Sequence, residues 1–202
     1  MLLTMEKKNA IILFVRHPEK GRVKTRLARD IGDDRALEIY KQLLDHTQAI
    51  TKELDCDRFV FYADSIVAND IWEGNDYRKR VQAGDTLGER MKNAFSEVFN
   101  SGYQKVVIIG SDCPQLSSAI ISDAFKTLDT TDVVIGPATD GGYYLLALNY
   151  MITAVFENKQ WSTDTVLTDT VADLEKLAVT YSLAPVLRDI DTGDDLVQLG
   201  YS

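Results

Sequence analysis

The sequence predicts an α/β fold with a mostly parallel sheet, and two observations lead to this prediction. Continuous apolar runs at residues 10–16, 105–109 and 132–138 have the length and composition of strands buried on both faces. Between these runs lie segments with apolar residues at three-to-four spacing, which is typical of amphipathic helices. Strands that alternate with helices indicate helices packed on the faces of a parallel sheet.

Each element in the first half of the chain has its own signal. The run 10–16 is followed by a loop with Pro18 and Gly21, and then by the start of a helix at 23–31. Residues 36–54 have apolar residues at three-to-four spacing, which is typical of a single amphipathic helix. The next predicted elements are a strand at 58–63, a short strand and turn at 80–84, and a helix at 87–99.

The second half continues the alternation. The strand that starts at residue 105 ends in a polar turn, and Ser117 is the expected N-cap of the next helix. The remaining predicted elements are a helix at 117–128, strands at 132–138 and 143–148, a helix at 162–178 and a late strand at 179–186. No internal repeat or low-complexity linker interrupts this pattern, so residues 1–202 are expected to form a single domain.

Composition limits the possible functions. The net charge of −9 argues against a nucleic-acid-binding protein, which would present a basic face. The N-terminal segment is too short and too polar to be a signal peptide. No apolar run reaches the roughly 18 residues that a membrane span needs. We therefore expect a cytoplasmic protein that binds neither nucleic acid nor membrane; the oligomeric state stays open.

A cationic loop follows the first strand of this acidic chain. A helix N-terminus offers free N–H groups, and lysine and arginine side chains add full charges, so this loop is expected to bind a small anion such as phosphate. His17 can donate to a phosphate or simply shape the loop, and a solvated surface cluster is the alternative for the whole stretch. Neither a Walker A sequence nor G-x-G-x-x-G is present. The basic residues are Arg16, Lys20, Arg22, Lys24, Arg26 and Arg29.

Carboxylates follow another strand and recur near the C-terminus. Asp112 lies in the turn 110–114, and Asp191 is one of four aspartates in residues 189–195. Mg²⁺ (or Mn²⁺) prefers one or two carboxylates together with phosphate oxygens and water, so Asp112 and Asp191 are the predicted metal ligands. The alternatives are an Asx-turn at Asp112 and helix capping near Asp191.

A glycine-rich turn follows the third apolar strand. Gly141 and Gly142 allow the backbone to approach a flat or bulky ligand, and Asp140 can accept hydrogen bonds from hydroxyl groups. A tight hairpin turn is the alternative, and both can hold together.

In this order, these segments resemble one family, the small bacterial glycosyltransferase-A-like proteins similar to 2-phospho-L-lactate guanylyltransferase. That family belongs to the nucleotide-diphospho-sugar transferase superfamily. The matching segments cover nearly the whole chain: Pro18 with Gly21-x-x-Lys24-Thr25-Arg26-Leu27, Gly84-x-x-Leu87-Gly88-x-Arg90-Met91, Gly110-Ser111-Asp112-Cys113-Pro114, Gly136-Pro137-x-x-Asp140-Gly141-Gly142-Tyr143, Trp161-Ser162-Thr163, and Asp189-x-Asp191-Thr192-x-x-Asp195-Leu196.

The resemblance implies a Rossmann-like three-layer α/β/α sandwich of the glycosyltransferase-A type, a nucleotide site at the end of the first strand and a divalent metal. Asp112, and with it Asp191, would then hold the metal. The implied catalytic residues are Lys24, Arg26 and Asp112. The implied nucleotide-binding residues are Arg16, His17, Gly21, Lys24, Thr25, Arg26 and Gly84. The implied substrate-binding residues are Asp140, Gly141, Gly142, Tyr143, Trp161, Ser162 and Thr163.

Two reactions are compatible with these residues. In the first, a small phosphorylated acceptor attacks the α-phosphate of a nucleoside triphosphate and pyrophosphate leaves, which needs positioning and charge neutralisation. In the second, a sugar is transferred from a nucleotide-sugar. The dense cationic loop suits a triphosphate and favours nucleotidyl transfer. A nucleotide-binding regulator without catalysis would lack the metal carboxylate or the phosphate-binding cation, and both are present.

Overall fold

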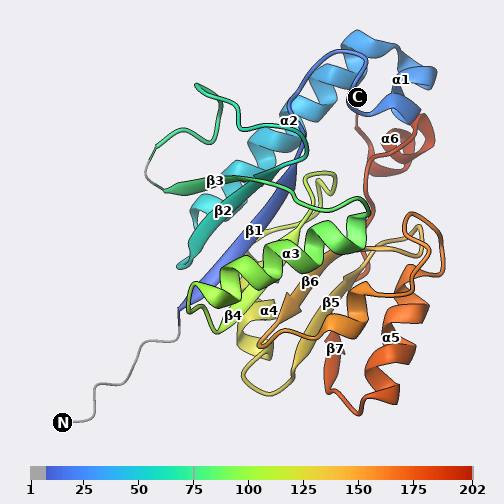
Figure 1. The fold of residues 1–202 in the computed structure, drawn as a ribbon. Helices are drawn as coiled ribbons and strands as arrows, with labels where there is room; N and C mark the ends of the chain where they lie inside the picture. Colours follow the sequence, from blue (N-terminus) through green and yellow to red (C-terminus); the bar gives the residue numbers. More distant parts are fainter. Residues whose placement is uncertain (1–7, 75, 202) are drawn as a thin grey trace.

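The computed structural model describes residues 8–74 and 76–201, which form a three-layer α/β/α sandwich around a seven-stranded sheet (Figure 1). The predicted fold class is therefore confirmed. The strands are β1 (Asn9–Val15), β2 (Asp57–Tyr62), β3 (Tyr77–Val81), β4 (Lys105–Ile109), β5 (Val133–Pro137), β6 (Tyr143–Leu148) and β7 (Tyr181–Leu183). The helices are α1 (Thr25–Ile31), α2 (Asp33–Lys52), α3 (Leu87–Asn100), α4 (Ser118–Thr127), α5 (Val166–Lys176) and α6 (Gly193–Leu199), with a 3₁₀ helix η1 (Thr153–Phe156).

The sheet has the strand order β3-β2-β1-β4-β6-β5-β7. Its parallel pairs are β1 with β2, β1 with β4, β2 with β3, and β5 with β7. Strand β6 runs antiparallel to both neighbours, β4 and β5. The carboxyl ends of β1, β4 and β5 therefore lie at the same edge of the sheet as the start of β6.

Apolar residues on both faces of the sheet pack against the helices that cover it. One core cluster joins α2 and α4 to the face that carries Ile11, Leu13 and Val107. The other joins α3, η1 and α5 to the face that carries Ile12 and Val106. Successive residues of β1 thus serve opposite faces, which explains why this strand reads as a continuous apolar run rather than an alternating one.

A third, smaller cluster connects α1 and α2 to α6 near the C-terminus. Leu27 of α1, Ile39 and Leu43 of α2 and Leu196 of α6 pack around Ile190, whose side chain is fully buried. Figure 1 shows α6 beside α1 at the upper end of the molecule. This packing brings the aspartates that precede α6 close to the loop that follows β1.

The helix caps follow the sequence signals. Ser117 accepts a hydrogen bond from the Ile120 amide, as expected for the N-cap of α4, and Thr86 and Glu89 form a capping box at the start of α3. Several boundaries differ from the predicted ones, and the late strand predicted at 179–186 is shortened to β7, Tyr181–Leu183. Helix α5 starts at Val166 instead of residue 162, and β3 starts at Tyr77 instead of residue 80. Within the described ranges, no helix has both the length and the apolarity needed to cross a membrane.

Candidate functional site

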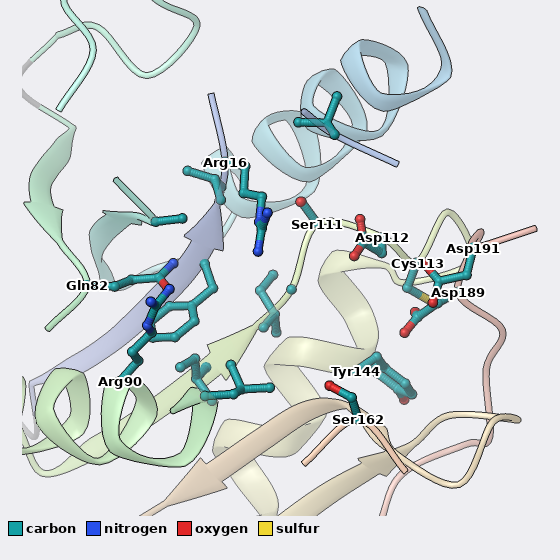
Figure 2. Close-up of a pocket in the computed structure, with 18 of the residues that line it drawn as sticks. Arg16, Gln82, Arg90, Ser111, Asp112, Cys113, Tyr144, Ser162, Asp189 and Asp191 are labelled. Carbon is teal, nitrogen blue, oxygen red and sulfur yellow. The ribbon is translucent and has the colours of Figure 1, made fainter. Parts of the chain in front are cut away.

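A cavity of about 720 Å³ opens at the sheet edge where β1 and β4 end. Its walls come from the loop after β1, the start of α3, the turn after β4, the start of β6 and the segment before α6. In an open α/β sheet, ligands bind beyond the carboxyl ends of the strands, so this is the expected position of a site. Figure 2 shows Asp112, Asp189 and Asp191 at one end of the cavity and Gln82 with Arg90 at the other.

Several of the predicted site residues line this cavity and others lie outside its lining. Those that line it are Arg16, Lys24, Thr25, Arg26, Asp112, Tyr143, Ser162 and Asp191. Those outside it are His17, Gly21, Gly84, Asp140, Gly141, Gly142, Trp161 and Thr163. Asp140 borders a smaller adjoining cavity together with Asp189 and Asp191. The cavity therefore unites the cationic loop with Asp112 and Asp191, although they are far apart in sequence.

Lys24 is the centre of the charged end of the cavity. Its Nζ lies 2.7 Å from Asp112 Oδ1 and 3.3 Å from Asp191 Oδ1, and it donates to the Ile190 carbonyl at 2.5 Å. Only 5% of the side chain is exposed. Burial lowers the pKa of Lys24, but the charges of Asp112 and Asp191 outweigh it, so the pKa is raised and the ammonium stays charged.

The backbone of Lys24 is strained in the same place. It is the N-cap of α1 and adopts the left-handed conformation, with φ 48° and ψ 41°. For a residue with a Cβ this conformation costs about 1–2 kcal/mol, and it persists only where the surroundings hold it. The contacts with Asp112, Asp191 and Ile190 are what hold it here.

Asp189 differs from its two neighbouring aspartates. Its Oδ1 is buried and has no hydrogen-bond partner among the described residues. Burial and the charge of Asp112 raise the pKa of Asp189 to about 7, against the opposing effect of Lys24. Asp112 and Asp191 remain 42% exposed. A buried carboxylate with an unused oxygen is a polar group that a ligand or cation could satisfy.

These side chains do not form a ready-made metal cage. Among residues 8–74 and 76–201, no three His, Cys, Asp or Glu side chains are arranged to hold a metal ion. Between Asp112 and Asp191 stands the ammonium of Lys24, a positive charge in the position a cation would take. The donor set is nevertheless of the type that Mg²⁺ and Mn²⁺ bind, because it consists of carboxylate oxygens beside an open cavity.

Arginine side chains line the rest of the cavity. Arg16 is fixed through its backbone, since the Tyr40 hydroxyl accepts from its amide at 2.9 Å and donates to its carbonyl at 3.1 Å. Arg90 donates from Nε to the Gly84 carbonyl at 3.0 Å, and its terminal nitrogens have no protein hydrogen-bond partner among the residues that the structure describes. Helix α1 has only seven residues, so side chains rather than its N-terminus supply the positive charge. The arginines that line the cavity are Arg16, Arg22, Arg26 and Arg90.

The turn between β5 and β6 and the segment before α5 form the opposite rim. Gly141 has φ +89°, and a Cβ at this position would lie 2.2 Å from the Asp164 carbonyl oxygen. Trp161 packs on Gly88 at the start of α3 and edge-on against Tyr143, with ring centroids 6.4 Å apart. Glycine is therefore required where these segments meet, and Trp161 contributes to the rim by packing instead of lining the cavity.

Many of the residues that line the cavity were absent from the predicted site, and three of them are Gln82, Arg90 and Asp189. Gln82 donates to the Phe61 carbonyl at 3.0 Å, and Arg90 faces it across the same end of the cavity (Figure 2). Both flank the turn before α3. Arg90 belongs to the matching segment Gly84-x-x-Leu87-Gly88-x-Arg90-Met91, but only Gly84 of that segment was a predicted site residue. Asp189 was considered with the other C-terminal aspartates, but its burial could not be read from the sequence. The position of Gln82 directly after a strand is the signal that could have identified it.

Comparison with known proteins agrees with this architecture. A proposed nucleotide-diphospho-sugar transferase from Desulfovibrio desulfuricans G20 is 33% identical, with a TM-score of 0.88 and coverage of 95% of this chain and 85% of that one. The 4-diphosphocytidyl-2C-methyl-D-erythritol synthase of Anaerococcus prevotii has a TM-score of 0.60 at 12% identity, with 95% and 94% coverage. The manganese complex of Rv0371c from Mycobacterium tuberculosis has a TM-score of 0.56 at 14% identity, with 97% and 99% coverage. No curated protein matches the sequence significantly.

The fold and the charged cavity at its strand ends define the class, a protein with the nucleotide-diphospho-sugar transferase fold. Residues 46–163, more than half of the chain, match the model of a family described as "Uncharacterized protein conserved in bacteria (DUF2064)". The chain belongs to this DUF2064 family.

Proposed function

We propose that the protein is a metal-assisted transferase that moves a nucleotidyl group from a nucleoside triphosphate to a small phosphorylated acceptor, with release of pyrophosphate. The observation that carries this proposal is the meeting of Lys24, Asp112 and Asp191 in a cavity lined by arginines. The fold supports it, because the 33% identical relative is a proposed nucleotide-diphospho-sugar transferase. Structures with the same fold include a complex of a sugar-acid synthetase with CTP.

The residues of this chain would act through charge and position. Arg16, Arg26 and Arg90 can bind the oxygens of a polyphosphate, because guanidinium groups pair well with phosphate. Asp112 and Asp191 would hold Mg²⁺ or Mn²⁺, which supplies neutralisation of the phosphate charge when bound. No side chain has to act as a covalent nucleophile, since positioning and electrostatic stabilisation are sufficient for phosphoryl-group chemistry.

The acceptor would approach from the β6 side of the cavity. Tyr143 and Ser162 line that side, and Asp140 borders the adjoining smaller cavity. Gly142 donates its amide to Asp140 Oδ1 at 2.9 Å, which fixes the turn and leaves the second carboxylate oxygen available for a hydroxyl group. The rim that Trp161 helps to build would limit the size of the acceptor.

Glycosyl transfer from a nucleotide-sugar is a second candidate function. The observation that favours it is the acidic composition of the β6 side, where Asp140, Asp189 and Asp191 border one small cavity. Carboxylates there would accept hydrogen bonds from sugar hydroxyls. Both reactions use the same polyphosphate and metal positions, so the leaving group is what distinguishes them.

The experiment begins with a thermal-shift screen of GTP, CTP, UTP, ATP and common nucleotide-sugars, with and without Mg²⁺. A bound ligand raises the unfolding free energy by RT ln(1 + [L]/Kd). Donors that bind are then incubated with acceptors and Mg²⁺, and the products are separated by ³¹P NMR. Pyrophosphate supports nucleotidyl transfer, and a nucleoside diphosphate supports glycosyl transfer. Unchanged donors with every acceptor would contradict both.

Asp112→Asn and Asp123→Asn form a matched pair for this screen. Asp112 lines the cavity, whereas Asp123 lies on α4 and pairs with Lys126 at the surface. We expect Asp112→Asn to abolish the Mg²⁺-dependent part of the shift and to lower turnover by about a hundredfold or more. Asp123→Asn should behave like the wild type. Equal responses from the two variants would mean that the metal is not bound at Asp112.

A further inference from the structure

The hydroxyl group of Tyr40 makes two hydrogen bonds to one residue of the loop that follows β1. It accepts from the Arg16 amide at 2.9 Å and donates to the Arg16 carbonyl at 3.1 Å. Strand β1 ends at Val15, whose carbonyl accepts from the Ala63 amide, and no backbone hydrogen bond reaches Arg16 from the other described residues. Tyr40 therefore provides the pairing for the backbone at the point where the chain leaves the sheet.

The same hydroxyl group also contacts the turn after β4. Burial and the charge of Asp112 raise the pKa of Tyr40, and hydrogen bonds with the Arg16 backbone and the Ser111 side chain oppose this effect. A phenol has one donor and two acceptor sites, so the bonds to Arg16 and Ser111 use all of them. One buried hydroxyl group thus connects the loop after β1 with the turn after β4.

Helix α2 holds this hydroxyl group in a fixed position. The side chain of Tyr40 is only 4% exposed and belongs to the core cluster that contains Val15 and Leu44. Side chains in a close-packed core stay in one rotamer for most of the time. The position of the Arg16 backbone is therefore set by the packing of α2 on the sheet.

Arg16 has more freedom to bind an anion than two other arginines of the cavity. Arg22 pairs with Glu19 at 3.0 Å. Arg26 lies 3.8 Å from Asp191. The guanidinium group of Arg16 has no carboxylate partner among the described residues, and Figure 2 shows it directed into the cavity beside Ser111. Its backbone is fixed and its charge is available.

We propose that Tyr40 is a positioning residue for polyphosphate binding, and that its hydroxyl group acts by fixing the backbone of Arg16 so that the guanidinium group meets the phosphate oxygens. The proposal rests on the proposed function, because it concerns how the same cavity binds a nucleoside triphosphate. Its new content is that a core residue of α2 controls the affinity of the site through a cation on another element.

The effect follows from preorganisation. A guanidinium group binds phosphate through several directed hydrogen bonds, so its affinity depends on where the side chain starts. Without the Tyr40 hydroxyl group, the amide and carbonyl of Arg16 lose their partner, and the loop has to be ordered when the ligand binds. Ordering a loop on binding lowers the affinity.

The test is calorimetric titration of the full chain with inorganic tripolyphosphate, without metal. Tyr40→Phe removes the hydroxyl group and keeps the ring. Tyr77→Phe is the matched control, because Tyr77 belongs to the same core cluster, its hydroxyl donates to the Gln48 carbonyl at 3.3 Å, and it does not line the cavity. We expect Tyr40→Phe to bind tripolyphosphate at least tenfold more weakly than the wild type, and Tyr77→Phe to stay within twofold of it.

A double-mutant cycle separates positioning from a general loss of structure. If Tyr40 acts through Arg16, Tyr40→Phe should cost less than twofold in affinity once Arg16→Met is already present. If the hydroxyl group only stabilised the fold around the cavity, Tyr40→Phe would cost the same with and without the Arg16 side chain.

The inference is overturned if Tyr40→Phe and Tyr77→Phe bind equally, if the full loss persists beside Arg16→Met, or if the wild type does not bind tripolyphosphate. Circular dichroism checks the fold. If Tyr40→Phe does not fold, 4-aminophenylalanine at position 40 replaces it under the same criteria, because its amino group donates to the Arg16 carbonyl but accepts poorly from the amide.

Wild-type pyrophosphate release with Mg²⁺, measured separately, decides the proposed function. Release without an effect of Tyr40→Phe on tripolyphosphate binding supports that function and overturns this inference. The expected loss of binding in Tyr40→Phe, without any release by the wild type, supports the positioning role and contradicts the proposed reaction.

Discussion

Replacing Gly141 by alanine tests how the rim of the cavity is built. The new methyl group would lie 2.2 Å from the Asp164 carbonyl oxygen, and this backbone atom cannot rotate away as a side chain would. The chain at Gly141 also has φ +89°, which is unfavourable for alanine. The left-handed strain costs about 1–2 kcal/mol and forced overpacking about 1–3 kcal/mol. The expected loss of unfolding free energy is therefore about 2–5 kcal/mol.

Thermal and urea unfolding measure this loss. In a chain of 202 residues, each 1 kcal/mol lowers Tm by about 2–4 °C, so a fall of about 4–20 °C is expected. Gly102→Ala is the matched control. Gly102 has a similar φ of +91°, but a Cβ there would have nothing within 4 Å. Gly102→Ala should therefore lose only the strain contribution.

Fluorescence gives an independent measure of the same contact. If the methyl group pushes the segment before α5 away, Trp161 loses its packing on Gly88 and its emission moves to longer wavelength in the folded protein. The other tryptophan, Trp72, is buried and lies far from Trp161 in the sequence, so its emission serves as an internal reference. Equal destabilisation of Gly141→Ala and Gly102→Ala, with unchanged Trp emission, would refute the argument from the close approach.

Three further predictions concern the scaffold. Thr86→Ala removes the capping box of α3 and should cost about 1 kcal/mol in urea unfolding; an unchanged midpoint would contradict the assigned cap. Hydrogen bonds from Thr180 hold the pKa of Asp132 below its usual value, so the ionised form stabilises the fold above the unfolded-state pKa. Asp132→Asn should therefore be less stable than the wild type at neutral pH, with a gap that closes as pH falls through the folded-state pKa; a constant gap would exclude this linkage. Burial raises the pKa of Cys56 and Cys113 to about 12, so a thiol reagent at about pH 8 should label both only after unfolding, and rapid native labelling would show that the burial is wrong.

The elements of the fold were predictable because burial leaves a local pattern in the sequence. Strand β1 is apolar throughout since both of its faces are covered, and α2 shows the spacing of a helix with one buried side. The reversed direction of β6 leaves no mark in its own composition. It follows from the short connection at residues 138–142, which is too short for a parallel crossover of a dozen or more residues.

The candidate site was predictable in outline. The rule that ligands bind at the carboxyl ends of strands placed the loop after β1 and Asp112 at one edge, and the structure has both there. The pairing of Lys24 with the carboxylates depends on a left-handed backbone and on a side-chain rotamer, neither of which has a signature in a single sequence. The burial of the Asp189 oxygen likewise results from the packing around Ile190. This packing joins segments that are far apart in the sequence; Lys24 and Asp191, for example, are separated by 167 residues.

The antiparallel insertion of β6 divides the molecule into two parts with different freedom to vary. The cationic loop and the turn after β4 are built on β1 and β4, two strands inside the sheet with a neighbour on each side, so changes there disturb the sheet. The hairpin from β5 to β6 is a local unit whose tip, residues 138–142, meets the rim without carrying a crossover helix. Under the proposed function, sequence changes confined to the hairpin tip would alter the acceptor side of the cavity and leave the donor side unchanged.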